Sequence, residues 1–424
     1  MESAKWKMAA AVAGRRVLPL LAFAAFTALA ADPVVSGVTM TQDATTKNVT
    51  IGYTLSGADA IVTLDVTTNG VSIGGENLTK VWGDVNRKVV TGTRSIVWRP
   101  VMGTADMKPV VTAWRTDTPP DYMVIRMDRP QGATNVVPLY YANTNSIPGG
   151  FNNARYKTTH MIFRKCPAAE VVWRMGTPSS DEFFEVDQVA HLVKLTHDFY
   201  IGVYPCTQGQ FTALAGVGWR GRCRYTYSAN IDWAVHPMES INYDDLRGKT
   251  AGAQWPTSGD VDAGSFFGVL RAYTGMNFDL PTEAQWEYAC RAGTGTTGNI
   301  GVSYGTCWDE VSWINYNADG HTHEVGLKRP NAWNIYDMHG QVMEICRDWY
   351  GPYEFVDDET PVVDPEGAPS GEYRVARPAA FTNNHTPNHS GFRNKMKPSE
   401  GDMGGWHWNG STYFAGFRVA LEIE

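Results

Sequence analysis

The chain has 424 residues, of which 43% are hydrophobic and 12% aromatic, and its formal net charge is −8. This composition is typical of a globular protein, and the length suits two or three domains. The acidic balance argues against a nucleic-acid partner, which requires a basic face.

The first thirty residues have the composition of a targeting segment. Four basic residues, the last of them Arg16, precede an apolar run over 17–30 that ends in Ala28-Leu29-Ala30. This order predicts a secretory signal peptide over residues 1–30. The run is short for a stable transmembrane helix, although an uncleaved anchor is the alternative. We therefore expect a secreted, periplasmic or cell-surface protein with no membrane span after cleavage.

The six cysteines form no Cys-x-x-Cys pair, so a zinc ribbon or a thioredoxin motif has no support. They are Cys166, Cys206, Cys223, Cys290, Cys307 and Cys346. An exported protein permits disulfides, but the pairing stays open, and some of these residues can equally be buried thiols.

Short segments of period two occupy residues 33–116. They cover 48–55, 61–66, 93–98 and 109–114, with turn residues between them. This spacing predicts an immunoglobulin- or fibronectin-like β-sandwich module. Such a module is either an adhesive or sugar-binding module or a spacer beside another domain. A spacer is favoured, because no cluster of exposed aromatic residues or ligand carboxylates stands out. Residues 117–158 are expected to be a linker that includes one optional strand at 122–127.

A second domain is expected over residues 159–424, with mixed elements that make the chain α+β. Strands are predicted at 161–164, 171–177 and 191–204, and a closing strand at 414–422. Helices are predicted at 208–214, 242–247, 265–273 and 281–293. The last helix has a capping box formed by Thr282 and Gln285.

Four blocks of this second domain resemble the formylglycine-generating enzyme (sulfatase-modifying factor) family. They are Phe199–Phe211, Leu280–Gly293, Asn331–Glu344 and Gly416–Ala420, in the family's order and spacing. The resemblance implies an irregular fold related to that of C-type lectins and tied together by calcium. Enzymes of the family oxidise a sulfatase cysteine to formylglycine with O₂ and a copper ion held by two cysteines, whereas relatives without that pair serve in binding or structure.

The copper chemistry of the family lacks its ligands in this sequence. The family's thiolates follow a block of the type Arg-Val-x-Arg-Gly-Gly-Ser-Trp, which here reads Arg374-Val-Ala-Arg-Pro-Ala-Ala-Phe381, and no cysteine follows Cys346. The counterparts of the two thiolates fall near Asn383 and Asn388, whose amides are poor ligands for Cu(I). Copper is therefore not expected, and no catalytic residue is assigned.

Polar residues of the same region are candidates for a groove that binds a peptide or a glycan. They are Asn383, His385, Asn388, His389 and Trp406, with Phe381, His407 and Trp408 beside them. Core packing is the alternative for the aromatic residues. A metal held by His385 and His389 is disfavoured, because Pro387 opposes the helix that their spacing would need, and His321 with His323 is equally weak.

A structural calcium site is the second implication of the resemblance. It falls on Asp337, the carbonyls of Gly340 and Val342, and Glu344, all of which supply the hard oxygen atoms that Ca²⁺ prefers. A second site would use Asn315 and the Tyr316 carbonyl with Asp319. The alternative is a carboxylate pair on a polar turn.

Two functions follow from the sequence. The first is an exported, non-catalytic member of the family that presents a peptide- or glycan-binding groove. The alternative is a formylglycine-generating oxidoreductase with a non-standard metal site.

Overall fold

Two antiparallel sheets enclose one apolar core in the N-terminal part of the chain. The computed structural model describes residues 31–101, 103–128, 136–216, 232–296, 298–301, 308–355, 357–384, 388–399 and 414–424. One sheet has the order β1 (Val34–Gln42), β2 (Val49–Ser56), β7 (Gly92–Trp98) and β5 (Val81–Gly83). The other joins β4 (Val71–Ser72), β3 (Ala60–Thr68) and β6 (Arg87–Val89), and β8 (Met107–Trp114) pairs with β3.

The alternation of buried and exposed side chains along the strands explains this core. Every second side chain of β2 is buried, and these side chains pack with residues of β3 and β7 such as Leu64 and Trp98. The strands predicted at 48–55, 61–66, 93–98 and 109–114 are therefore all present.

The segment expected to be a linker contributes to the main sheet instead. The five-stranded sheet has the order β10 (Leu139–Tyr141), β9 (Tyr122–Arg126), β11 (His160–Cys166), β14 (Phe199–Gly202) and β22 (Ala420–Glu422). Met123 and Ile125 of β9 are almost completely buried in the largest core. The linker prediction for 117–158 was wrong apart from its optional strand, because this segment has its own apolar pattern to bury. Two 3₁₀ turns, η1 (Thr144–Ser146) and η2 (Ala154–Lys157), follow β10.

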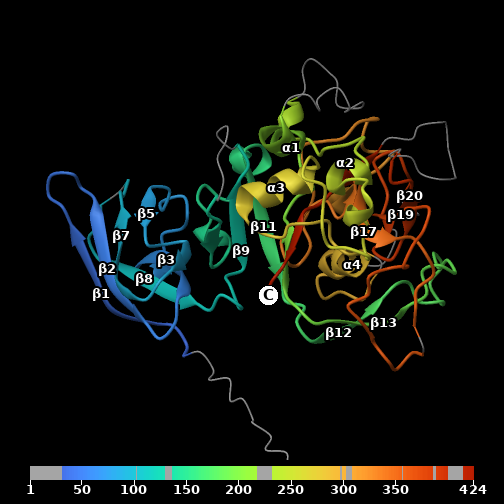
Figure 1. Ribbon diagram of the computed structural model, residues 1–424. Coiled ribbons are helices and arrows are strands. Elements are labelled where there is room, and N and C mark those ends of the chain that lie inside the picture. The colour runs from blue at the N-terminus through green and yellow to red at the C-terminus, as the bar shows by residue number, and fades with distance from the viewer. Residues whose placement is uncertain are drawn as a thin grey trace, which may run out of the picture. The chain divides into compact units, whose positions relative to one another are not determined.

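The four predicted helices are present to within two residues at each end. They are α1 (Gln208–Ala215), α2 (Tyr243–Arg247), α3 (Phe266–Thr274) and α4 (Glu283–Arg291). Thr207, Asn242, Ser265 and Thr282 cap them through their side chains. Helices α1 and α2 both contact α3 (Figure 1), and their apolar faces join the main core. Short helical turns occur at η4 (Trp233–Val235), η5 (Ala251–Ala253) and α5 (Trp308–Val311).

The predicted closing strand is divided between two sheets. Strand β21 (Ala415–Phe417) lies in the sheet ordered β20 (Asn394–Met396), β19 (Arg374–Arg377), β17 (Met343–Trp349) and β21, whereas β22 lies in the five-stranded sheet. Arg418 lies between these two strands and is fully buried. Two small sheets complete the domain, one of β12 (Val171–Met175), β13 (His191–Leu195) and β18 (Val362–Val363), the other of β15 (Ser312–Trp313) and β16 (His339–Gly340).

The described cysteines are free and buried: Cys166, Cys206, Cys290 and Cys346. Cys223 and Cys307, like the predicted signal peptide, lie outside the described residues. Within the described ranges, no helix has the length and apolar character needed to cross a membrane.

Candidate functional site

Helix α4 carries a row of charged residues into the protein interior. Glu283, Glu287 and Arg291 are spaced by four, which aligns them along one side of the helix, and all three are buried. Nη1 and Nη2 of Arg377, from β19, donate to Glu283 at 2.7 Å and to Glu287 at 2.6 Å. Arg393 donates to both carboxylate oxygens of Glu283, at 2.6 and 2.8 Å. The helix is therefore anchored by ion pairs rather than by an apolar stripe alone.

The charges in this network hold one another ionised. Burial opposes ionisation of Glu287, but Arg291 and Arg377 outweigh it and keep the pKa of that carboxyl at about 2. The Glu287 carboxylate also accepts a hydrogen bond from the backbone N–H of Gly176 at 2.8 Å. The pKa values of Glu283 and Glu287 are both lowered, so these two carboxylates are ionised near neutral pH and serve the fold.

The two amides at the expected copper positions serve as backbone partners. Oδ1 of Asn383 accepts from the N–H of Ala380 at 3.0 Å, and Oδ1 of Asn388 accepts from the N–H of Gly340 at 2.8 Å. The buried Cys290 thiol contacts Ser390 Oγ at 3.6 Å, and burial raises its pKa to about 12, so it stays protonated. These donors do not fit a Cu(I) ion, which needs thiolate ligands.

Most of the predicted groove residues that the structure describes are interior. Asn388 and Phe381 are fully buried and His389 is 1% exposed, whereas Asn383 is half-buried. Asn388 and His389 therefore do not form the surface of an open groove, because the Asn388 amide is used to bind the β16 backbone. His385, Trp406, His407 and Trp408 lie outside the described residues.

The other histidine pair has structural contacts. The His323 ring stacks on Trp313 with 3.7 Å between ring centroids, and its Nε2 lies 3.1 Å from the carbonyl oxygen of Ala318. His321 Nδ1 lies 2.7 Å from the carbonyl oxygen of Thr322.

His389 is a buried neutral base, so we predict that the free energy of unfolding falls at low pH. Neither ring nitrogen has a partner within the described part of the chain, and burial together with Arg377 lowers its pKa to about 3. The unfolded chain takes up this proton near pH 6.5 and the folded chain does not, so stability falls as the pH drops from 6.5 towards 3. We expect His389→Phe to reduce the loss of unfolding free energy between pH 7 and pH 4.5 by about 1–3 kcal/mol, measured by urea denaturation. His197→Phe is the control, since that side chain is half exposed; an unchanged pH dependence in His389→Phe would contradict the assignment.

The carboxylate expected to bind calcium is occupied by an arginine. Arg418 donates to both oxygens of Glu344, from Nη2 at 2.7 Å and from Nε at 2.9 Å, and Trp286 Nε1 adds a bond of 2.6 Å. The same guanidinium donates to four backbone carbonyls: Gly202 at 2.9 Å, Val203 at 3.0 Å, Tyr336 at 2.8 Å and Asp337 at 3.3 Å. A carboxylate and several carbonyls are the ligands that Ca²⁺ prefers, and here they surround a guanidinium.

The other predicted calcium ligands do not form a coordination shell either. One oxygen of Asp337 accepts from the N–H of Gly326 at 2.6 Å, the other has no partner among the described atoms, and burial raises the pKa of this carboxyl to about 6. Asn315 and Asp319 of the second predicted site are exposed. The described residues contain no group of three His, Cys, Asp or Glu side chains placed to hold a metal. The positions Asp337, Gly340, Val342 and Glu344 therefore do not fit a calcium shell that uses Glu344.

Calcium dependence can be measured directly. We expect Glu344→Ala to lower the melting temperature by the same amount in calcium and in chelator, because the lost partner is Arg418 in both. Thermal unfolding of the wild type and the variant in each buffer tests this. A decrease in melting temperature that is seen only in the calcium buffer would instead support a calcium site at Glu344.

Asp348 is a candidate acid that the sequence reasoning missed. It lines a cavity of about 80 Å³ together with His191, Glu283 and Arg393. Burial, and then the charge of Glu283, raises the pKa of Asp348 to about 7. The cavity is small, with room for a few water molecules.

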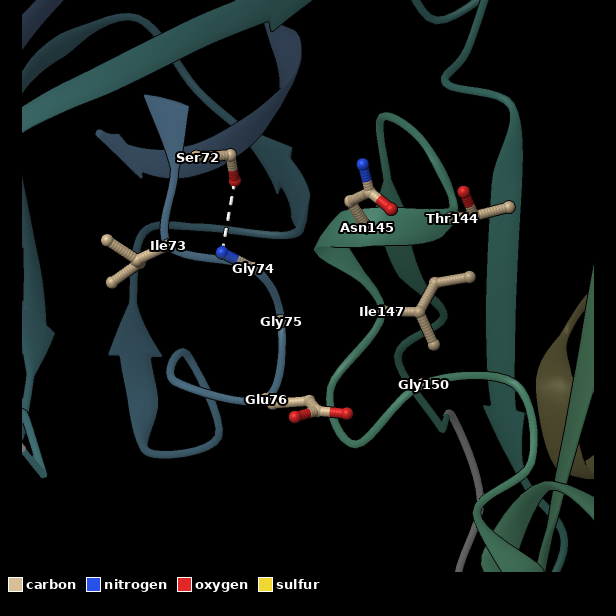
Figure 2. Close-up of a pocket in the computed structure, with 9 residues that line it drawn as sticks. All are labelled: Ser72, Ile73, Gly74, Gly75, Glu76, Thr144, Asn145, Ile147 and Gly150. Carbon is tan, nitrogen blue, oxygen red and sulfur yellow. Dashed lines mark hydrogen bonds between the residues drawn. The ribbon is translucent and has the colours of Figure 1, made fainter. Parts of the chain in front are cut away.

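Two larger hollows lie where the loops of the N-terminal sheets meet the segment around β10. Figure 2 shows the first, of about 280 Å³, between Ser72–Glu76 and Thr144–Gly150. A bond of 2.5 Å from the N–H of Gly75 to the carbonyl of Asn145 joins its two sides. A Cβ at Gly75 would overlap the backbone of Ile147, so only glycine permits this approach. The second hollow, of about 300 Å³, is lined by parts of Leu78–Arg87, β9, β10 and η2.

The geometry defines a sheet-rich α+β domain with few helices, fixed by buried arginine–carboxylate pairs and carrying an additional pair of N-terminal sheets. Residues 147–423 match the model of the sulfatase-modifying factor enzyme 1-like domain. The chain belongs to this family.

Curated relatives include the formylglycine-generating enzyme of Streptomyces coelicolor, 35% identical over 113 residues, which are 24% of this chain and 35% of that protein. The serine/threonine-protein kinase pkn1 of Chlamydia pneumoniae is 27% identical over 239 residues, or 54% of this chain and 34% of that protein. The chain thus spans about a third of the length of these relatives.

Solved structures with similarity include PvdO from Pseudomonas aeruginosa and Treponema denticola variable protein 1. Each is 22% identical, with TM-scores of 0.47 and 0.46, and each match covers 62% of this chain. The matches cover 94% and 95% of those two chains.

Proposed function

We propose that this protein is an exported, non-catalytic member of its family that acts by binding a peptide or a glycan. The support comes from the region where the family enzymes hold copper. Asn383 and Asn388 stand there as backbone hydrogen-bond partners, and the described cysteines are buried. A site built for oxidation would need accessible thiolates at these positions.

Two structural details accompany the proposal. We infer that residues 33–116 form an immunoglobulin- or fibronectin-like module, because two antiparallel sheets share one core there. We infer a C-type-lectin-like architecture for the family domain. Export rests on the signal-like sequence of residues 1–30, and amino-terminal sequencing of the protein recovered from the producing cell is expected to begin at Ala31.

The decisive experiment tests whether the chain converts a peptide cysteine to an aldehyde. The purified chain is incubated with Cu(I), O₂ and a Cys-x-Pro-x-Arg peptide, and the peptide is examined by mass spectrometry and with an aldehyde-reactive hydrazide. The formylglycine-generating enzyme of Streptomyces coelicolor serves as the positive control. We expect no aldehyde with this chain, and aldehyde formation would overturn the non-catalytic assignment.

A copper titration against a chromogenic Cu(I) chelator supplies the second measurement. We expect the chelator to retain the metal. Tight binding by the wild type that is lost in Cys290→Ala would identify a thiolate site and would contradict the proposal.

A further inference from the structure

We propose that the second hollow, between residues 78–87 and η2, binds a small carbohydrate that carries a carboxylate. This inference rests on the proposed binding function and gives it a location and a ligand class. It places the site outside the region of Asn388 and His389, whose side chains are buried.

The size and the construction of the hollow suit a small ligand. Its volume of about 300 Å³ lies at the lower end of the range for small-molecule sites in proteins. Its walls are joined by a backbone bond of 2.8 Å from the N–H of Tyr140 to the carbonyl of Asn86. Residues 32–424 form one compact unit, so both walls belong to the same body. A bond between the two walls favours binding, since walls that are already joined lose less entropy when a ligand binds.

An exposed aromatic ring provides an apolar platform. Trp82 lies on β5, lines the hollow and is 48% exposed, which is unusual for the largest apolar side chain. Leu139 of β10 lines the opposite wall and is 37% exposed. An indole offers a flat face for the C–H face of a pyranose ring, and its N–H remains available to a hydroxyl group.

The charged lining is entirely cationic. Arg87 and Arg155 line the hollow and no carboxylate does, although the chain as a whole carries a net charge of −8. The other hollow differs, since Glu76 is its single charged lining residue. Two guanidinium groups in one small pocket favour an anion with a planar pair of oxygens, which is the geometry of a carboxylate.

Both arginines retain donors for such a ligand. Arg155 is held in place by bonds from Nη2 to the carbonyl of Pro148 and to the Tyr156 hydroxyl, the latter at 2.7 Å. Its Nη1 makes no hydrogen bond to the described residues, so this nitrogen is left to donate to an incoming oxygen atom. Arg87 makes one contact of 3.4 Å, with Asp84, which does not line the hollow.

Neutral hydrogen-bonding groups complete the lining. Tyr141, Tyr156 and His160 contribute to the walls. Burial, together with Arg155, lowers the pKa of His160, so its ring is neutral near pH 7 and can serve hydroxyl groups. The combination of an exposed aromatic ring, hydroxyl partners and two guanidinium groups matches an acidic sugar better than inorganic phosphate, which has no apolar face.

The test is calorimetric titration of the full mature chain with sodium glucuronate and, as the uncharged counterpart, with glucose. We expect glucuronate to bind at least about tenfold more tightly than glucose, since tenfold corresponds to one modest charge-assisted contact. Arg87→Gln is expected to remove most of that preference, and Trp82→Ala to weaken both sugars. Lys88→Gln is the matched control, because it removes an exposed positive charge next to Arg87 that does not line the hollow. Unchanged melting temperatures verify that each variant is folded.

Three results would overturn the proposal. They are no binding of glucuronate, equal affinity for glucuronate and glucose, and equal losses in Arg87→Gln and Lys88→Gln, which would indicate a general charge effect. Binding of a short polyglutamate peptide in place of glucuronate would assign the pocket to an acidic peptide. These failures leave the aldehyde assay unaffected, so they can be distinguished from failure of the non-catalytic assignment.

Discussion

Replacing Arg418 with methionine is expected to lower the free energy of unfolding by about 3–5 kcal/mol, the range found when one member of a buried ion pair is removed. The guanidinium is fully buried, and it serves the Glu344 carboxylate and four carbonyl oxygens at once. Methionine fills similar volume and supplies no donor, so the carboxylate charge would remain buried with only the Trp286 N–H beside it. Urea denaturation followed by tryptophan fluorescence measures the change, and the yield of soluble protein reports it if the variant does not fold.

The control for this prediction is Arg329→Met. Arg329 pairs with Glu310 at 3.3 Å, and both side chains are more than half exposed. Exposed pairs of this kind contribute about 0–1 kcal/mol. Equal effects at Arg418 and Arg329 would show that the buried cluster does not hold the fold together.

Glu283→Gln is the second change with a large expected effect. Glu283 accepts from Arg377 and from Nε and Nη2 of Arg393, so the substitution leaves two buried guanidinium groups with too little negative charge. We expect a loss of about 3–5 kcal/mol in the free energy of unfolding, measured by denaturation at pH 7.

A double-mutant cycle separates the interaction energy between Glu283 and Arg393 from the other effects of each substitution. Adding Arg393→Met to Glu283→Gln removes one of the uncompensated charges, so the double variant is expected to lose less than the sum of the single variants by more than about 1 kcal/mol. Additive losses would mean that Glu283 and Arg393 are not coupled, against the contacts seen in the structure.

The sequence predicted those parts of the fold in which a local rule is decisive. Helix α4 could be placed because Thr282 and Gln285 form a capping box, and both bonds of that box are present. Strand β2 could be placed because its apolar side chains alternate. The family resemblance located the domain, and the matched residues 147–423 include the predicted range from 159 apart from its final residue.

The site was predicted less well, because its partners are distant in sequence. Glu344 and Asp337 look like oxygen ligands when the motif is read alone, and nothing local reveals that Arg418 lies against them. Arg377 and Arg393 likewise meet Glu283 from about a hundred residues away. His389 and Asn388 were predicted to line a groove, but both are buried. The local sequence gives no sign that a polar residue in a loop is buried. The spacing of Glu283, Glu287 and Arg291 was visible, and a charged row on a helix that also carries Ala284, Trp286, Ala289 and Cys290 could have indicated an interior network.

The division of the closing segment between two sheets has a consequence for folding during synthesis. Strand β21 pairs in parallel with β17, and β22 pairs with β14, so residues 415–422 supply one strand to each sheet and the Arg418 side chain between them. The ribosome makes these residues long after β14 and β17, and contacts of such sequence separation form late. These pairing partners of β17 and β14 and the guanidinium that pairs with Glu344 therefore become available only once residues 415–422 have been made.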